Sequence, residues 1–179
     1  LNPERFQRIT RRDELNRVFD GIEAAQAAGF DELKLDTVVV RGQNDDELED
    51  LLTYASKLGA ELRFIEYMDV GGATRWSPEA VVPRTEILQQ LSVARDTPRA
   101  MPNRGSAPAE RFRLPDGTVF GVIASATSPF CGSCDRSRVT ADGTWYRCLY
   151  AAHGTDLKAP LRSGASDEEL ARLIAQMWQ

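Results

Sequence analysis

Apolar residues in the first part of the chain recur at helical and then at strand-like spacing. Over residues 13–28 they return every three or four positions and end at Gly29, which predicts an amphipathic helix. Residues 33–40, rich in β-branched side chains, predict a largely buried strand. A second helix with Asn44 as its N-cap and a second strand over 62–68 follow. Helices and strands that alternate through short links predict βα units with a parallel sheet, an α/β fold.

The two predicted parallel strands are too few to form a stable open sheet or a closed barrel. We therefore expect further strands, or a partner chain, to complete the layer. An exposed parallel edge also promotes association between copies of a chain, so a homodimer is one expectation.

The pattern changes after residue 68. Gly71-Gly72 marks a loop, residues 85–91 allow a short helix at most, and the proline-rich residues 97–108 predict coil. The chain is expected to divide near residues 70–95 into an α/β half and a half made of β-hairpins and helices.

Two Asp-Gly pairs in the second half predict β-hairpins. The pair at 116–117 is flanked by strand-like residues, and so is the pair at 142–143. Near the C-terminus, Ser166 is followed three residues later by Glu169. This capping box predicts a final helix with one apolar face.

Composition and charge narrow the class of protein. Of 179 residues, 42% are hydrophobic, which is enough for a packed core. A net charge of −5 disfavours a general binder of nucleic acid or of anionic membranes. No apolar run approaches the ~18 residues of a membrane helix, and the N-terminus does not resemble a signal peptide. Three cysteines without an export signal favour the cytoplasm, with metal or redox chemistry.

The three cysteines form the strongest chemical motif. Cys131 and Cys134 make a C-x-x-C pair, and Cys148 follows on the returning strand of the second predicted hairpin. Thiolates are soft ligands that select zinc or iron–sulfur clusters. Spacing alone leaves two sites open: a closed zinc site completed by His153 in a non-catalytic module, and a [4Fe–4S] cluster with three thiolates and one open iron. Three unrelated buried thiols are the less favoured interpretation.

Arg136 and Arg138 lie close to this motif. On an extended strand the two side chains would share one face, since side chains alternate with a period of two. Two guanidinium groups beside a metal site suit a phosphate-bearing ligand. Ion pairs on a solvated strand explain the two arginines equally well.

Lys34 and Arg63 each lie within a predicted strand of the α/β half. A charged side chain in a buried strand is costly unless it faces a polar cavity or a partner. The two cations are therefore candidates for lining a substrate chamber. The carboxylates of Asp36 and Glu66 are the alternative partners, and the two interpretations are compatible.

These motifs together resemble the MoaA family, the radical S-adenosylmethionine GTP 3′,8-cyclases of molybdenum cofactor biosynthesis. The resemblance extends over essentially the whole chain. Its most specific part is the C-x-x-C with the third cysteine and the R-x-R pair. Other matching stretches are residues 1–6, 63–68, 121–123, 128–131, 142–143 and 148–149.

The resemblance implies an incomplete TIM-type barrel followed by a C-terminal extension. Residues 1–70 would be the last part of the barrel, and residues 71–179 the extension of β-hairpins and helices. The family uses two [4Fe–4S] clusters: one binds S-adenosylmethionine and cleaves it to a radical, and the other coordinates GTP through an open iron. The radical abstracts the ribose C3′ hydrogen, and C3′ then attacks guanine C8, which gives 3′,8-cyclo-7,8-dihydro-GTP.

The resemblance also assigns ligands and binding residues. Cys131, Cys134 and Cys148 match the ligands of the second cluster, and Met68 matches a contact to S-adenosylmethionine. The residues that match the GTP site are Lys34, Arg63, Arg136, Ser137 and Arg138. Cyclic pyranopterin monophosphate synthase, which acts next on the product, would be a downstream partner.

The sequence departs from the family's pattern in three ways. The C-x-x-x-C-x-x-C that holds the first cluster is absent, the Gly-Gly tail is absent, and Asp36 stands where asparagine is expected. We therefore expect this chain to be a C-terminal portion of the enzyme, with no catalytic residue of its own. It would not generate the radical, but it would still be able to hold the second cluster and GTP.

Overall fold

The computed structural model describes residues 1–179 apart from 31, 70–75, 103–104, 130 and 179. The chain divides into two compact units. Unit 1 comprises Leu1–Met68 and Trp76–Gly132, and unit 2 comprises Asp69–Arg75 and Ser133–Gln179. The loop expected at Gly71-Gly72 lies outside the described residues. The division at residue 70 into barrel and extension stays a prediction.

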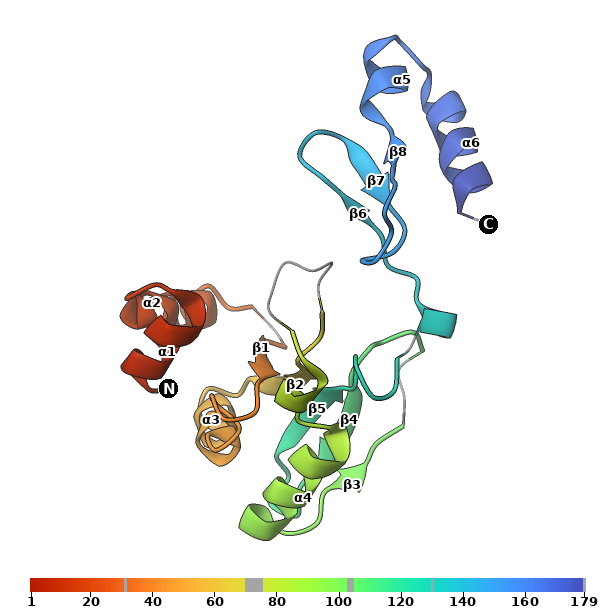
Figure 1. The fold of residues 1–179 in the computed structure, drawn as a ribbon. Helices are drawn as coiled ribbons and strands as arrows, with labels where there is room; N and C mark the ends of the chain where they lie inside the picture. The colour runs from red at the N-terminus through yellow and green to blue at the C-terminus, as the bar shows by residue number, and fades with distance from the viewer. Residues whose placement is uncertain (31, 70–75, 103–104, 130, 179) are drawn as a thin grey trace. The chain divides into compact units, whose positions relative to one another are not determined.

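Unit 1 is built on a five-stranded mixed sheet in the order β1-β2-β5-β4-β3 (Figure 1). The strands are β1 Lys34–Val39, β2 Glu61–Glu66, β3 Arg99–Ala100, β4 Glu110–Arg113 and β5 Val119–Ile123. β1, β2 and β5 are parallel, whereas β4 pairs antiparallel with β5, and β3 antiparallel with β4. The two predicted strands and the hairpin around Asp116-Gly117 are confirmed. The structure joins that hairpin to the parallel strands, so one sheet contains both.

The helices of unit 1 extend the predicted set. They are α1 Pro3–Thr10, α2 Leu15–Ala27, α3 Leu48–Lys57, α4 Arg84–Arg95 and the 3-10 turn η1 Pro78–Ala80. A further 3-10 turn, η2 Cys131–Ser133, begins in unit 1. α4 is longer than the expected short helix over 85–91. α1 was not predicted, although Asn2 caps it by accepting a hydrogen bond from the Arg5 N–H.

Asn44 is not the N-cap of α3, because Glu47 occupies that position. The buried Asn44 side chain instead accepts a hydrogen bond from the Val40 N–H (2.8 Å) and donates one to the Val38 carbonyl (2.9 Å). An amide side chain can satisfy both kinds of backbone group where the chain leaves a sheet. Asn44 therefore closes the turn after β1.

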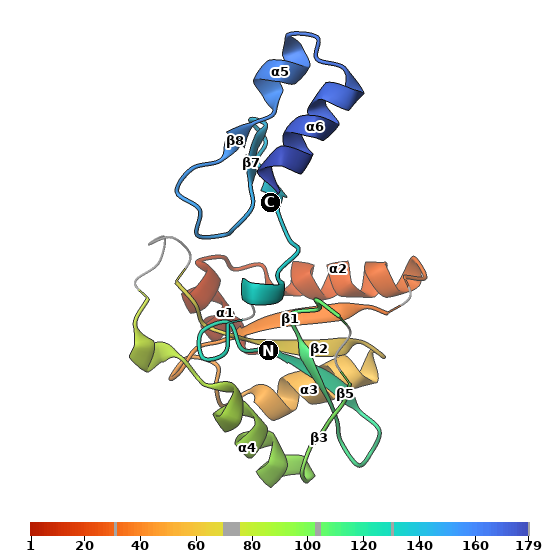
Figure 2. The same ribbon diagram turned by 90° about the vertical axis from the view of Figure 1, so that its right-hand side faces the viewer.

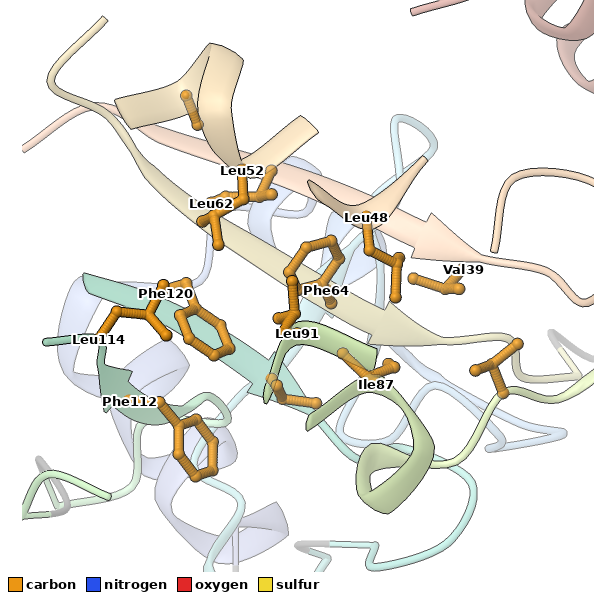
Figure 3. Packing of buried hydrophobic residues seen from close by; sticks show 13 residues of the cluster. Val39, Leu48, Leu52, Leu62, Phe64, Ile87, Leu91, Phe112, Leu114 and Phe120 are labelled. Carbon is orange, nitrogen blue, oxygen red and sulfur yellow. The ribbon is translucent and has the colours of Figure 1, made fainter. Parts of the chain in front are cut away.

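The core of unit 1 lies between the sheet and two helices. α3 and α4 cover the same face of the sheet (Figure 2), and apolar side chains from β2, β5 and β4 fill the space beneath them (Figure 3). Phe120 lies at its centre, with its ring centroid 6.1 Å from that of Phe64 and 5.6 Å from that of Phe112. α2 packs against α3 through Phe19 and Tyr54, whose ring centroids are 5.5 Å apart.

Unit 2 has little core of its own. It contains a three-stranded antiparallel sheet and two helices: β6 Arg138–Val139, β7 Thr144–Tyr146, β8 Thr155–Asp156, α5 Lys158–Arg162 and α6 Asp167–Met177. The hairpin around 142–143 and the capping box at Ser166 are confirmed. Among the described residues of unit 2, Trp145 alone is buried, and its ring stacks on that of Trp178 with centroids 5.7 Å apart. In neither unit does a described helix have the length and apolar character needed to cross a membrane.

Candidate functional site

All three cysteines are free and exposed. Cys131 begins η2 at the end of unit 1, and Cys134 and Cys148 belong to unit 2. The interpretation as three unrelated buried thiols is therefore wrong. Free cysteine is among the residue types most often buried, so three exposed thiols in one chain favour a chemical role over a packing role.

The two cysteines of unit 2 each accept a hydrogen bond from nitrogen. Arg136 donates from Nη2 to Cys134 Sγ at 3.4 Å, and the Tyr150 N–H donates to Cys148 Sγ at 3.4 Å. The backbone N–H of Arg136, followed by its guanidinium, lowers the pKa of the Cys134 thiol. Donors around sulfur stabilise the thiolate, which is the form that binds metal.

The donor set fits a thiolate-bound iron–sulfur cluster. Three soft ligands are accessible, and one has a lowered pKa. The described residues of unit 2 also form little apolar core, and a bound metal group supplies folding free energy to such small units. Within the part of the chain that the structure describes, no three His, Cys, Asp or Glu side chains are gathered as a metal site requires, and His153 is exposed. The described side chains therefore do not distinguish a cluster from a zinc site.

The arginine pair lies at the start of β6. Arg138 is the first residue of this strand and Arg136 precedes it, so a shared strand face for the two side chains stays a prediction. Arg138 pairs in register with Tyr146 and is exposed, as is Ser137. Arg136 contacts Cys134, which places a guanidinium directly beside a candidate cluster ligand.

Unit 1 carries a second group of charges on the sheet face opposite α3 and α4. We call it the charged face, and it consists of Lys34, Asp36, Glu61, Arg63 and Arg111. The register places Lys34 opposite Glu61, Asp36 opposite Arg63, and both Arg63 and Arg111 opposite Gly121. Residues in register share a face, so these charges lie on the side that the two helices leave uncovered.

The partners of Lys34 and Arg63 are not the expected ones. Lys34 pairs with Glu32 (Nζ–Oε2 3.4 Å), and Arg63 pairs with Glu61 (Nε–Oε1 3.3 Å). The pairing with Asp36 or Glu66 is therefore wrong. In β2, Glu61 and Arg63 alternate with Leu62 and Phe64, which are buried, so Arg63 stays away from the core.

Arg111 was not identified from the sequence. Its Nε donates to Oε2 of Glu61 at 2.8 Å, and its Nη2 lies 2.7 Å from the same oxygen in an ion pair. Since Arg63 pairs with the other oxygen, one carboxylate holds two arginines. A Cβ on Gly121 would lie 3.2 Å from Arg63 Cγ, so the glycine leaves room for that stem. The sequence signal that could have identified Arg111 is the alternation of arginine with Phe112 in β4. An open cavity of about 280 Å³ borders this group at Lys34, Glu61 and Arg111.

Comparison with known proteins places the chain in a family. Residues 60–179 match the family model described as Molybdenum Cofactor Synthesis C. The chain belongs to this family. The matched region of the Molybdenum Cofactor Synthesis C family contains the three cysteines and the R-x-R pair, and the resemblance seen in the sequence is confirmed.

The curated relatives are named as GTP 3′,8-cyclases. GTP 3′,8-cyclase 3 of Mycobacterium bovis is 51% identical over all of this chain and 47% of its own length. GTP 3′,8-cyclase 1 of Mycobacterium tuberculosis is 50% identical over all of this chain and 50% of its own length. GTP 3′,8-cyclase of Streptomyces coelicolor is 46% identical over 97% of this chain and 51% of its own length. The chain thus spans about half the length of these relatives.

Proposed function

We propose that this chain is the part of a GTP 3′,8-cyclase that holds the GTP-binding [4Fe–4S] cluster. The observation that carries the proposal is the set of three exposed cysteines, one with a lowered pKa and an arginine beside it. The printed names of the relatives agree with it, and so does the family's description. The intact enzyme would convert GTP to 3′,8-cyclo-7,8-dihydro-GTP with S-adenosylmethionine, in molybdenum cofactor biosynthesis.

The proposed cluster ligands are Cys131, Cys134 and Cys148. When bound, the cluster would supply an open iron to which a purine nitrogen can coordinate. Arg136 lies 3.4 Å from Cys134 Sγ, so a ligand phosphate held by its guanidinium would lie next to the cluster.

The other proposed contacts follow the same chemistry. Lys34 and Arg63 of the charged face, with Ser137 and Arg138 of unit 2, would bind the rest of the nucleotide. Glu61 would hold Arg63 in place, since it also anchors Arg111. Met68 lies two residues after the end of β2 and would contact S-adenosylmethionine.

The sheet of unit 1 supports the proposal of a partial barrel. Three parallel strands carry helices on one face and charges on the other, as the wall of a substrate-lined barrel does. A homodimer, a cytoplasmic location and transfer of the product to cyclic pyranopterin monophosphate synthase remain parts of the proposal.

The first test is metal analysis of the chain purified without oxygen, with its visible spectrum and acid-labile sulfide. About four irons and four sulfides per chain, lost in Cys148→Ser, would support the cluster. Colourless protein with one zinc, lost in His153→Ala, would instead support a zinc-binding module.

The second test is titration of the cluster-loaded chain with GTP. Replacing both Arg136 and Arg138 with alanine should weaken GTP binding by about 10-fold or more, because charged hydrogen bonds to phosphate are lost. Replacing Arg162 and Arg172, which lie in α5 and α6 of the same unit, removes the same charge and should change it little. Equal affinity in both double variants would contradict the proposed binding residues.

A further inference from the structure

Glu66 is a buried carboxylate in unit 1 that the proposed chemistry does not use. It is the last residue of β2 and has no exposed surface. A charged or polar group in such a place is costly unless hydrogen bonds replace its lost hydration. Both of its carboxylate oxygens accept hydrogen bonds.

The donors to Glu66 come from two segments far apart in sequence. Oε1 accepts from the Arg84 N–H (2.7 Å) and the Thr127 hydroxyl (2.6 Å). Oε2 accepts from the Ala126 N–H (2.9 Å) and the Thr127 N–H (2.7 Å). The Ser125 hydroxyl also donates to the Glu66 carbonyl at 2.9 Å.

Each of these segments needs such an acceptor. Arg84 is the first residue of α4, and Pro83 before it provides no side-chain cap, so the carboxylate serves the helix N-terminus. Ala126 and Thr127 lie in the turn after β5, where both residues are otherwise exposed. Glu66 therefore fixes the direction in which the chain leaves the sheet.

The chain that leaves the sheet here leads to the cysteines. Cys131 follows Thr127 by four residues, and Met68 follows Glu66 by two. We propose that Glu66 is a positioning residue for the cluster: by clamping the turn at 125–127 to the end of β2, it sets where the Cys131 thiolate is presented. This role rests on the proposed function, because it needs the cluster.

Glu66→Gln tests this role with little change of shape. The carboxamide has one oxygen and one NH₂ group, so at least one backbone N–H that now meets an oxygen would meet a donor. Asn44→Ala is the matched control, since it also removes a buried side chain that holds a turn after a strand, but that turn leads to α3. Both variants are loaded anaerobically with ferrous iron and sulfide.

Two measurements are made on each folded, loaded variant. Glu66→Gln should lose iron to a chelator about 10-fold faster than the wild type, as supporting residues around metal sites typically affect retention. Its amides at Ala126 and Thr127 should exchange hydrogen faster, whereas Asn44→Ala should show faster exchange at Val40 and wild-type iron retention. If Glu66→Gln does not fold, Thr127→Val, which removes one donor, should show the same effects in a weaker form.

The outcomes separate this role from the proposed function. A wild-type chain that takes up no iron would overturn both. A wild-type chain that loads normally, with equal iron retention in Glu66→Gln and Asn44→Ala, would overturn the positioning role alone. Faster iron loss in Glu66→Gln, or in Thr127→Val where Glu66→Gln does not fold, together with wild-type iron retention in Asn44→Ala, would establish it.

Discussion

At the scale of single residues, the neighbours of Cys134 alter the chemistry of its side chain. The backbone N–H of Arg136 lowers its pKa, and the guanidinium adds to this. A lower pKa means more thiolate at neutral pH, which is the form that alkylating reagents attack. In the metal-free chain we expect the alkylation rate of Cys134 to rise with pH around a midpoint below that of an ordinary thiol. Peptide mass spectrometry after timed alkylation measures it.

Arg136→Ala should raise this midpoint only in part, because the backbone donor remains. Arg138→Ala removes the same charge two residues away and should leave the midpoint close to the wild-type value, since only Arg136 is hydrogen-bonded to the sulfur. A midpoint that moves equally in both variants would show that general charge, not the hydrogen bond, controls Cys134.

Residue partners were the least predictable feature of the candidate site. The sequence identified Lys34 and Arg63 as charged positions in strands, but their carboxylate partners are Glu32 and Glu61. Glu61 is two residues from Arg63 and was within reach of the period-two argument. The pairing of Glu61 with Arg111 was not predictable from the sequence, because it depends on β5 pairing with β2 and β4 pairing with β5. The local sequence pattern does not specify the register between strands that are distant in the chain.

At the scale of elements, β5 contributes to the core of unit 1 through Phe120. This ring is fully buried between Phe64 and Phe112. Phe120→Ala should lower the free energy of unfolding of unit 1 by about 3–5 kcal/mol, as truncation of a buried aromatic leaves a cavity. Urea denaturation followed by circular dichroism measures this change.

Phe30→Ala is the control for this prediction, because Phe30 is 69% exposed. It should change the free energy of unfolding by less than about 0.5 kcal/mol. A similar loss in the two variants would mean that Phe120 is not part of a packed core.

Elements were predictable where a local signal marks them. The two Asp-Gly turns and the Ser166 capping box specify backbone geometry within a few residues, and all three are confirmed. The prediction that Asn44 caps α3 was wrong because asparagine is equally suited to cap a helix and to close a turn. Only its hydrogen bonds to Val38 and Val40 show which of the two roles it has. The length of α4 was underestimated because the polar residues of its first turn obscure the helical spacing of Ile87 and Leu91.

At the scale of the whole molecule, the two units differ in how much of their stability comes from packing. Unit 1 has one continuous apolar cluster between its sheet and helices. In the described part of unit 2, Trp145 is the one buried residue, and helices α5 and α6 leave Leu161 and Ile174 exposed. Sequence patterns predicted α2, α3, α6 and the strands of both hairpins. They did not predict α1, β8 or α5, and the prediction of coil over residues 97–108 is wrong at β3. The difference in packing between the units is seen only in the structure.

This difference leads to a prediction about how cluster binding couples to folding. A group that binds only the folded form adds its binding free energy to stability, and a unit with little core gains most. In the metal-free chain, limited proteolysis should cut within Ser133–Gln179 before it cuts unit 1, and loading with iron and sulfide should slow those cuts by about 10-fold or more. Cys148→Ser should abolish the protection while leaving the cleavage rate of the metal-free chain nearly unchanged, because its exposed side chain contributes little packing. Equal cleavage of the two units without metal, or protection that persists in Cys148→Ser, would show that unit 2 is held together by something other than a thiolate-bound cluster.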